Sequence, residues 1–495
     1  MFKGKKNQID MTEGPLLGKM IRFALPLIFT NLLQLFYNSA DMFVVGNFCD
    51  DPNALGSVGC TSSIINLILG LMLGLSAGVS VTISQSIGSG DKKRIERAVH
   101  TAVLLAIFVG IIIGITGFFL APALLKLMKT PDVFIEQATL YVQIYFCGTI
   151  GNAVFNFCSG ILRSRGDSFR PLIFSCVGGV TNVVLNLVFV LVFGMGIEGV
   201  AISTIIAQMI SAVLSLIYLS KLDDACRVDI KSLRIDRGMF LSFVRVGIPA
   251  GVQGMMFSFS NMLLQGSYNS LGPIAVNANT AAVNVDSYIY NVLVAFYHVA
   301  LNFSSQNFGA KKYGRMWKVF GLNCSCVIAV GLTLGILCTV FSGFLVKIFI
   351  AEPQMPEVNE IAVSIDDSSH NIMSEEEALA EYNVMMEDYK ETVKQAKSRL
   401  LIMGLFYFTC ALMDTGTALL RSIGKSMTAT VITVFGVCVF RIIWINTVFV
   451  KFPVLLALYL VYPVTWLLTF AALALAFVIS FKKFLKGEKA AQNAA

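Results

Sequence analysis

The stretch RFALPLIFTNLLQLFYNSADM (residues 22–42) returns later in the chain as RVGIPAGVQGMMFSFSNMLLQ (245–265), with Pro26 aligned to Pro249. Each copy is apolar and long enough to cross a bilayer, which takes about 20 residues of α-helix. Two further pairs of segments follow in the same order: SQSIGSGDKKR (84–94) with SQNFGAKKYGR (305–315), and GILRSRGDSFRP (160–171) with ALLRSIGKSMTA (418–429). The matched Arg, Gly and Gln residues are polar, so chance similarity between apolar segments does not explain them. The chain therefore predicts two copies of one membrane-spanning unit.

The remainder of the chain has the composition of a membrane protein. Hydrophobic residues make up 56% and charged residues 14% of the 495 positions, whereas a soluble domain carries about 25% charged residues. Apolar runs of spanning length number twelve: 21–45, 56–86, 98–125, 137–162, 170–194, 196–220, 240–270, 274–308, 317–350, 400–420, 428–450 and 454–481. We predict an all-α polytopic membrane protein with twelve transmembrane helices in two pseudo-symmetric six-helix bundles.

Lysine and arginine are distributed unevenly between the two sides of these spans. With the N-terminus placed in the cytoplasm, the segments on that side carry 28 of the 37 Lys and Arg residues and the opposite segments carry eight. Cytoplasmic loops are enriched in Lys and Arg, so we predict a plasma-membrane protein with both termini in the cytoplasm. The net charge of +7 then reflects topology and does not indicate nucleic-acid binding.

The same topology divides the chain into regions. Both units begin with a span that runs outward, so the repeat is parallel and leaves a cleft between two bundles, as alternating access requires. The predicted regions are a cytoplasmic N-terminal segment (1–20), an N-lobe (21–220), a cytoplasmic linker (221–239), a C-lobe (240–482) and a cytoplasmic tail (483–495).

One segment of the C-lobe has no counterpart in the N-lobe. Residues 352–398 contain twelve Asp or Glu residues and three Lys, and they form a predicted extracellular acidic insertion. Ser374 and Glu377 have the spacing of a helix capping box, which predicts a helix that continues into the tenth span after a flexible stretch, 359–373. The insertion is either a solvated flap or a lid over the outer mouth.

Five polar residues of the first unit stand out inside predicted spans. A carboxylate such as Asp41 costs about 2.5–3.5 kcal/mol in the middle of a spanning helix, so it is expected to face a protein interior or an aqueous cavity. Tyr37 lies four residues earlier and shares its helix face. Asn182 and Asn186 are also four residues apart, and Thr204 contributes a hydroxyl. Carboxylate, amide and hydroxyl oxygens suit a hard cation such as sodium, or a proton relay.

Several motifs resemble those of the multidrug and toxic compound extrusion (MATE) family. In order they are LPLIFTNLLQLFYNSADMFVVGNF, AVHTAV, GMGIEGVAIST, SSQNFGAKKYGR, LMDTGTALLRSIGKS and VYPVTW. The resemblance covers roughly residues 15–352 and 400–482. It implies a secondary active multidrug exporter, which moves amphipathic or cationic organic compounds against inward sodium or protons by alternating access.

The resemblance also implies roles for the polar residues of the first unit. The family's N-lobe cation site matches the positions of Tyr37, Asp41, Asn182, Asn186 and Thr204, with sodium or a proton as the coupling ion. Some members of the family carry Asp where this chain has Asn186. The alternative that the two Asn residues only hydrogen-bond neighbouring helices stays open. Pro26 removes a backbone hydrogen bond and can kink the first span, a change that in the family switches the N-lobe. Its repeat counterpart is Pro249.

The second unit carries a different set of candidates. Asp414 in the tenth span matches the family's C-lobe carboxylate. A subset of the family with a C-lobe sodium site also uses a Glu in the seventh span, where this chain offers only Gln253 and Gln265. Asp286 in the eighth span, which either lines the cleft or caps a local break, and Arg441 in the eleventh each require a partner or an aqueous lumen. A pairing of Arg441 with Asp414 stays open. His298 in the eighth span is either a proton relay or a packing residue.

Other function classes have less support in the sequence. It contains no GxxxxGKS/T loop for nucleotides and no HExxH motif, so neither ATP-driven transport nor metalloprotease activity is expected. Two alternatives remain: a flippase for lipid-linked precursors or polysaccharides of the same superfamily, and a membrane receptor or enzyme without transport. The expected partners are small organic molecules and the lipid bilayer, without nucleic acid or a cofactor, and the expected assembly is a monomer.

Overall fold

The computed structural model describes residues 8–49, 51, 54–128, 130–354 and 375–494, and these are almost entirely helical. The first half consists of α1 (Leu16–Phe48), α2 (Ala54–Ser89), α3 (Lys92–Leu127), α4 (Asp132–Cys147), α5 (Thr149–Ser164), α6 (Phe169–Leu187), the π-helical η2 (Val188–Val192) and α7 (Ile197–Ser220). The second half consists of η3 (Ile230–Ser232), α8 (Arg237–Asn269), α9 (Pro273–Gly309), α10 (Tyr313–Val340), α11 (Ser342–Phe349), α12 (Glu375–Ser422), α13 (Ser426–Thr433), η4 (Val434–Val439), α14 (Phe440–Trp444), η5 (Ile445–Phe449) and α15 (Leu455–Ala494).

Most of these helices are long and apolar enough to span a membrane. Among the described residues, ten helical segments are long and apolar enough to cross a membrane, and α4 with α5, bent by 47° at Gly148, makes an eleventh. The twelfth is α9, whose 37 residues are long enough to span but include several Asn and one Asp. Large apolar side chains such as Phe119 and Val192 are 74% exposed, as a lipid-facing surface requires. The predicted all-α membrane fold is confirmed, and the number of spans is approximately consistent with the predicted twelve.

Two details differ from the expected spans. The fourth is broken at Gly148, and the ninth, expected over 317–350, ends at Val340 and is followed by the separate short helix α11. The expectation that α12 would continue from the insertion into the tenth span is confirmed, because α12 is one helix of 48 residues. Ser374 and the stretch 359–373 lie outside the described residues.

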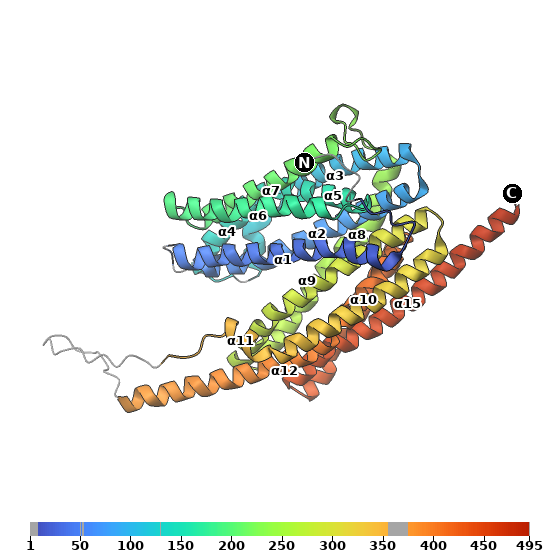
Figure 1. Cartoon of the computed structure of the whole chain (residues 1–495). Coiled ribbons are helices and arrows are strands. Elements are labelled where there is room, and N and C mark those ends of the chain that lie inside the picture. The colour runs from blue at the N-terminus through green and yellow to red at the C-terminus, as the bar shows by residue number, and fades with distance from the viewer. Residues whose placement is uncertain (1–7, 50, 52–53, 129, 355–374, 495) are drawn as a thin grey trace.

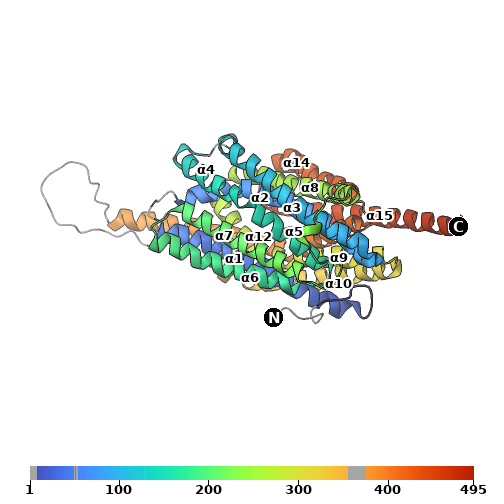
Figure 2. The same cartoon turned by 90° about the horizontal axis from the view of Figure 1, so that it is seen from above.

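The repeat is visible as two layers of helices. In Figure 1 the N-lobe helices α1–α7 lie above α9, α10, α12 and α15 of the C-lobe, with α8 beside α2, and the two layers diverge toward the end that carries α11. The start of α12 and the end of α15 project from opposite ends of the molecule in both views (Figures 1 and 2). We call the end that carries the loops after α2, α5, α7, α9 and α12 the basic end, because Lys92, Arg165, Lys221, Lys311 and Lys425 lie there.

The lobes approach each other closely where α2 packs on α8. A Cβ atom at Gly74 would overlap the backbone of Gly251, and one at Gly78 would overlap the backbone at Phe243 and Gly247. Small residues let membrane helices come this close and gain van der Waals contact along the backbone. The glycines of α2 and α8 therefore fix the α2–α8 contact on which the lobes meet.

Candidate functional site

The N-lobe encloses a cavity of about 220 Å³ between α1, α2 and α4–α7. Tyr37, Asp41, Asn182 and Thr204 line it. Asn186 lies behind them, fully buried, and its Nδ2 donates a hydrogen bond to Oδ1 of Asp41. The fold thus brings together all five residues that the sequence singled out in this lobe.

Hydrogen bonds fix the orientation of the amide beside Asp41. The Ser203 hydroxyl donates to Oδ1 of Asn186, so the Asn186 nitrogen must point at the carboxylate. Asn182 donates to the Thr204 hydroxyl at 3.2 Å, and both side chains line the same cavity as Asp41.

One atom of this cluster is left without a partner. Oδ1 of Asn182 is buried and accepts no hydrogen bond from any described residue. An unsatisfied buried acceptor costs about 1–3 kcal/mol. A carboxylate and an unpartnered amide oxygen in one cavity provide ligands for a small cation, or for an ammonium group of an organic compound.

Tyr37 lies against a glycine of α6. A Cβ atom at Gly179 would overlap the Tyr37 ring, so only glycine allows this side chain its position beside Asp41. Sequence reasoning missed Gly179 and Ser203, although the adjacent pair Gly178–Gly179 in a spanning helix is a signal of close packing. The helix α1 is continuous through Pro26, whose carbonyl accepts a hydrogen bond from Thr30 at 2.8 Å.

The C-lobe encloses a second cavity of about 210 Å³. Of the five candidates in this lobe, Asp414 of α12 and Arg441 of α14 line it. No ion pair within 4 Å joins these two residues, so the pairing that the sequence left open is not formed.

Gln253 and His298 do not line the C-lobe cavity and instead contact side chains of neighbouring residues. Gln253 accepts a hydrogen bond from Arg421 at 2.9 Å, and Arg421 also donates to the Tyr297 hydroxyl at 2.6 Å. The ring of His298 lies against that of Tyr297, and its Nδ1 has no partner among the described residues. The helix α8 is continuous through Pro249, whose carbonyl accepts from Thr430.

Asp286 has a role that the sequence did not reveal. It forms an ion pair at 3.1 Å with Arg399 of α12, and the two side chains are 2% and 3% exposed. Arg399 also donates to Asn279 and to the Tyr268 hydroxyl. Because α9 is continuous here, Asp286 does not cap a helix break, contrary to one of our expectations. Arg399 was missed because its position next to the acidic insertion assigned it to an exposed segment.

At the basic end, the repeated SQ motifs join the lobes by exchanged contacts. Gln85 donates to the carbonyl of Ser422 at 2.8 Å, and Gln306 donates to the carbonyl of Ser164 at 2.5 Å. The two Gln residues are repeat counterparts, and so are the two Ser residues. Both helices are tightly packed here, since a Cβ at Gly309 would overlap the carbonyl of Gln85. The basic end is therefore closed by contacts that each lobe makes with the other.

A segment before α1 crosses this closed end. Residues 8–15, which we call the strap, contact the N-lobe through Ile9, whose backbone N–H donates to the carbonyl of Gly166 at 3.0 Å. They contact the C-lobe through Met11, which is fully buried and whose carbonyl accepts from Asn307 at 3.0 Å. The strap thus bridges both lobes.

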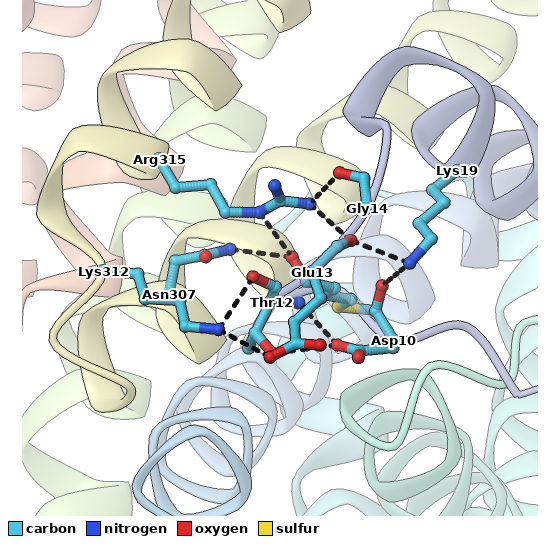
Figure 3. A network of polar contacts seen from close by, with 9 residues as sticks. Asp10, Thr12, Glu13, Gly14, Lys19, Asn307, Lys312 and Arg315 are labelled. Atoms are coloured by element: carbon cyan, nitrogen blue, oxygen red, sulfur yellow. Dashed lines mark hydrogen bonds and ion pairs between the residues drawn. The ribbon is translucent and has the colours of Figure 1, made fainter.

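Two cations of the C-lobe hold the strap from one side, as Figure 3 shows. Arg315 donates to the carbonyls of Met11, Glu13 and Gly14 at 3.3, 2.7 and 2.8 Å. Lys312 donates to the Thr12 carbonyl and pairs with the Glu13 carboxylate, each at 3.2 Å. Partial burial raises the pKa of Asp10, but hydrogen bonds from Thr12 and the charge of Lys19 lower it by a larger amount. The pKa of Asp10 is therefore below its usual value.

Comparisons with known proteins agree with this architecture. The sequence profile of the MatE family matches residues 26–188 and 249–365, more than half of the chain. The probable multidrug resistance protein YpnP of Bacillus subtilis is 32% identical over 345 residues, which cover 70% of this chain and 77% of that protein.

Solved structures show the same fold at low sequence identity. A transporter of the MOP superfamily from Pyrococcus furiosus has a TM-score of 0.82 and 18% identity, covering 95% of this chain and 97% of that one. A variant of a MATE transporter from Vibrio cholerae has a TM-score of 0.80 and 17% identity, covering 94% and 97%. With its two six-span lobes and its sequence match in both of them, the chain belongs to the MatE family of multi-pass membrane proteins.

Proposed function

We propose that this protein is a secondary active multidrug exporter, which moves amphipathic or cationic organic compounds out of the cell in exchange for inward sodium or protons. The observation that carries the proposal is Asp41, a carboxylate in an intramembrane cavity beside the unpartnered oxygen of Asn182. The name of the Bacillus relative, a probable multidrug resistance protein, supports the same substrate class.

The N-lobe cluster accounts for exchange of one cation for another. Asn186 donates to Oδ1 of Asp41 and Asp41 lines the cavity, so its second carboxylate oxygen is the group that binds a proton, a sodium ion or an organic ammonium. In a low-dielectric cavity the carboxylate is stabilised by one positive charge at a time. Arrival of the coupling ion therefore favours release of a cationic compound from the same carboxylate.

The closed basic end supplies the second requirement, which is access from one side at a time. By the excess of Lys and Arg we assign the basic end to the cytoplasm, with both termini there. Opening this end requires breaking the two exchanged Gln–carbonyl contacts and releasing the strap from one lobe. We assign the protein to the plasma membrane, where it acts as a monomer.

The test is efflux from proteoliposomes under imposed gradients. A sodium gradient and a proton gradient are applied separately, and the gradient that drives export of a fluorescent organic cation identifies the coupling ion. We expect Asp41→Asn to reduce gradient-driven efflux at least tenfold, because a neutral amide neither takes up a proton at this pH nor supplies the negative charge that neutralises a bound cation. Asp223→Asn, at an exposed position in the linker, is the matched control. Wild-type efflux rates in Asp41→Asn would exclude the coupling role of Asp41.

A further inference from the structure

The cavities of the two lobes occupy equivalent places in the repeat. The alignment of Pro26 with Pro249 pairs Asn38 with Asn261, and both line their cavities. The alignment of the third motif pair, continued without a gap, brings three further pairs of lining residues into register: Asn156 with Asp414, Thr204 with Tyr462, and Gln208 with Trp466. The C-lobe cavity is therefore the counterpart of the N-lobe cavity.

The chemistry of the two cavities differs. The N-lobe members of these pairs are neutral and polar, and Asp41 is the one charged residue among the described residues that line that cavity. The C-lobe cavity has aromatic residues at two of the paired positions, adds Tyr290 and Tyr407, and is lined by an acid and a base, Asp414 and Arg441.

Arg441 is a buried cation that lacks an anionic partner. Its side chain is 3% exposed, its Nη1 donates to Asn261 at 3.0 Å, and its guanidinium lies 4.4 Å from the centre of the Tyr462 ring. No described carboxylate lies within 4 Å of it, and its Nε has no hydrogen-bond partner among the described residues. A buried charge is normally paired, because desolvation of an isolated charge costs several kcal/mol.

The backbone around Arg441 is also unusual. The π-helical segments η4 (Val434–Val439) and η5 (Ile445–Phe449) flank the five-residue helix α14, which contains it. Single π-helical turns inside α-helices occur frequently at functional sites. The N-lobe counterpart contains only η2 among its described residues, so η4 is a feature of the C-lobe alone.

Asp414 provides the opposite charge from a different helix. It lies on α12, whereas Arg441 lies on α14, and no ion pair within 4 Å joins Asp414 to any described residue. The nearest cation along α12, Arg421, is engaged by Gln253 and Tyr297. One cavity thus holds an acid and a base that form no ion pair with each other, among aromatic rings.

We propose that the C-lobe cavity binds a zwitterionic aromatic compound, with its ammonium group at Asp414, its carboxylate at Arg441 and its ring among the aromatic side chains. Both charges of such a ligand are neutralised on binding, and aromatic faces favour stacking on the ring. Binding of such a compound does not depend on the proposed export function. Transport of the bound compound would rest on that function.

The test uses three fluorescent probes that share one ring. Nα-dansyl-lysine carries a carboxylate and an ammonium group, dansyl-cadaverine lacks the carboxylate, and dansyl-norleucine lacks the ammonium. Each is titrated into the purified full-length protein, and the dissociation constant is read from dansyl fluorescence. We expect the wild type to bind dansyl-lysine about tenfold or more tightly than either of the other probes, because charge-assisted hydrogen bonds form at both poles.

Two variants separate the poles. Arg441→Gln weakens dansyl-lysine and dansyl-norleucine about tenfold and leaves dansyl-cadaverine unchanged, and Arg441→Lys restores part of the loss. Asp414→Asn weakens dansyl-lysine and dansyl-cadaverine and leaves dansyl-norleucine unchanged. Arg227→Gln, at an exposed linker position, is the control.

The outcomes decide the proposal in either direction. If dansyl-lysine binds no more tightly than dansyl-cadaverine, or if both variants weaken all three probes equally, the zwitterion site is overturned. If Arg441→Gln does not fold, Arg441→Lys and Asp414→Asn replace it as the test. Arg441→Lys should weaken the probes that carry a carboxylate, and Asp414→Asn should weaken those that carry an ammonium group. If the two variants do not differ in this way, the site is refuted. No ion gradient is used, so these outcomes do not depend on whether the protein is an exporter.

Discussion

Removing the Arg315 side chain should open the basic end. The strap contacts the N-lobe at Gly166 and the C-lobe at Asn307, Lys312 and Arg315, so it can bridge the lobes only while this end is closed. Arg315→Ala deletes three hydrogen bonds from the guanidinium to strap carbonyls. It leaves the other strap contacts in place.

The expected size of the effect follows from these three bonds. Arg315 is partly exposed, so each bond is assigned the net value of an ordinary intramolecular hydrogen bond, about 0.5–1.5 kcal/mol. For an opening that releases the strap from the C-lobe, the three bonds together favour the closed state by about 1.5–4.5 kcal/mol. Since 1.4 kcal/mol is about a factor of ten in an equilibrium constant, the open state should become at least about tenfold more populated.

Hydrogen–deuterium exchange of the protein in lipid nanodiscs measures this shift. Exchange should rise in the strap, where the Ile9 amide is bonded to Gly166, and also in the two SQ motifs, 84–91 and 305–312, that close the end beneath it. Lys318→Ala removes an exposed cation from α10, the helix that carries Arg315. It should change exchange neither in the strap nor in the SQ motifs. If exchange rises in the strap but not in the SQ motifs, the strap is merely attached to the closed end and does not stabilise it.

Three further predictions concern the closure, the N-lobe cavity and the buried ion pair. Gln85→Ala and Gln306→Ala should raise exchange at the basic end to a similar extent, because each removes one of two equivalent contacts; a large effect of only one would disprove the exchanged arrangement. Gly179→Ala should displace the tyrosine beside the N-lobe carboxylate and reduce efflux of an organic cation in the proteoliposome assay without lowering the melting temperature of the C-lobe. Arg399→Ala should destabilise the protein by about 3–5 kcal/mol, because it leaves a buried carboxylate unpaired; thermal unfolding that matches Lys397→Ala would contradict this.

Hydropathy and the internal repeat were sufficient to predict the twelve spans, because each depends on local composition. Even α9, whose sequence contains several Asn and one Asp, was predicted as an apolar run of spanning length, 274–308. The i, i+4 spacing of Asn182 and Asn186 correctly placed both amides on one helix face. That face looks toward Asp41, 145 residues earlier than Asn186, and spacing alone cannot identify such a partner.

The missed residues share one physical reason, which is that their partners are distant in sequence. Arg399 is separated by 113 residues from Asp286, and the acidic insertion before it made it resemble a surface residue. Arg441 was found as a charge within a span, but only the packed structure shows that it and Asp414 line one cavity without pairing. Burial and pairing are properties of the assembled helices, and periodicity reports only which face a side chain is on.

The two copies of the repeat keep the same residue types at the closing contacts but differ in the residues that line their cavities, and the geometry explains this difference. Each closing contact joins a Gln of one lobe to a carbonyl of the other, so the two halves of the closure depend on the same residue types in both copies. Each cavity, by contrast, is lined by residues of a single lobe. A change such as Asn156 to Asp414 between the copies alters one cavity without disturbing the other or the interface. The fold can therefore keep a common opening motion while the two lobes present different charges to what they bind.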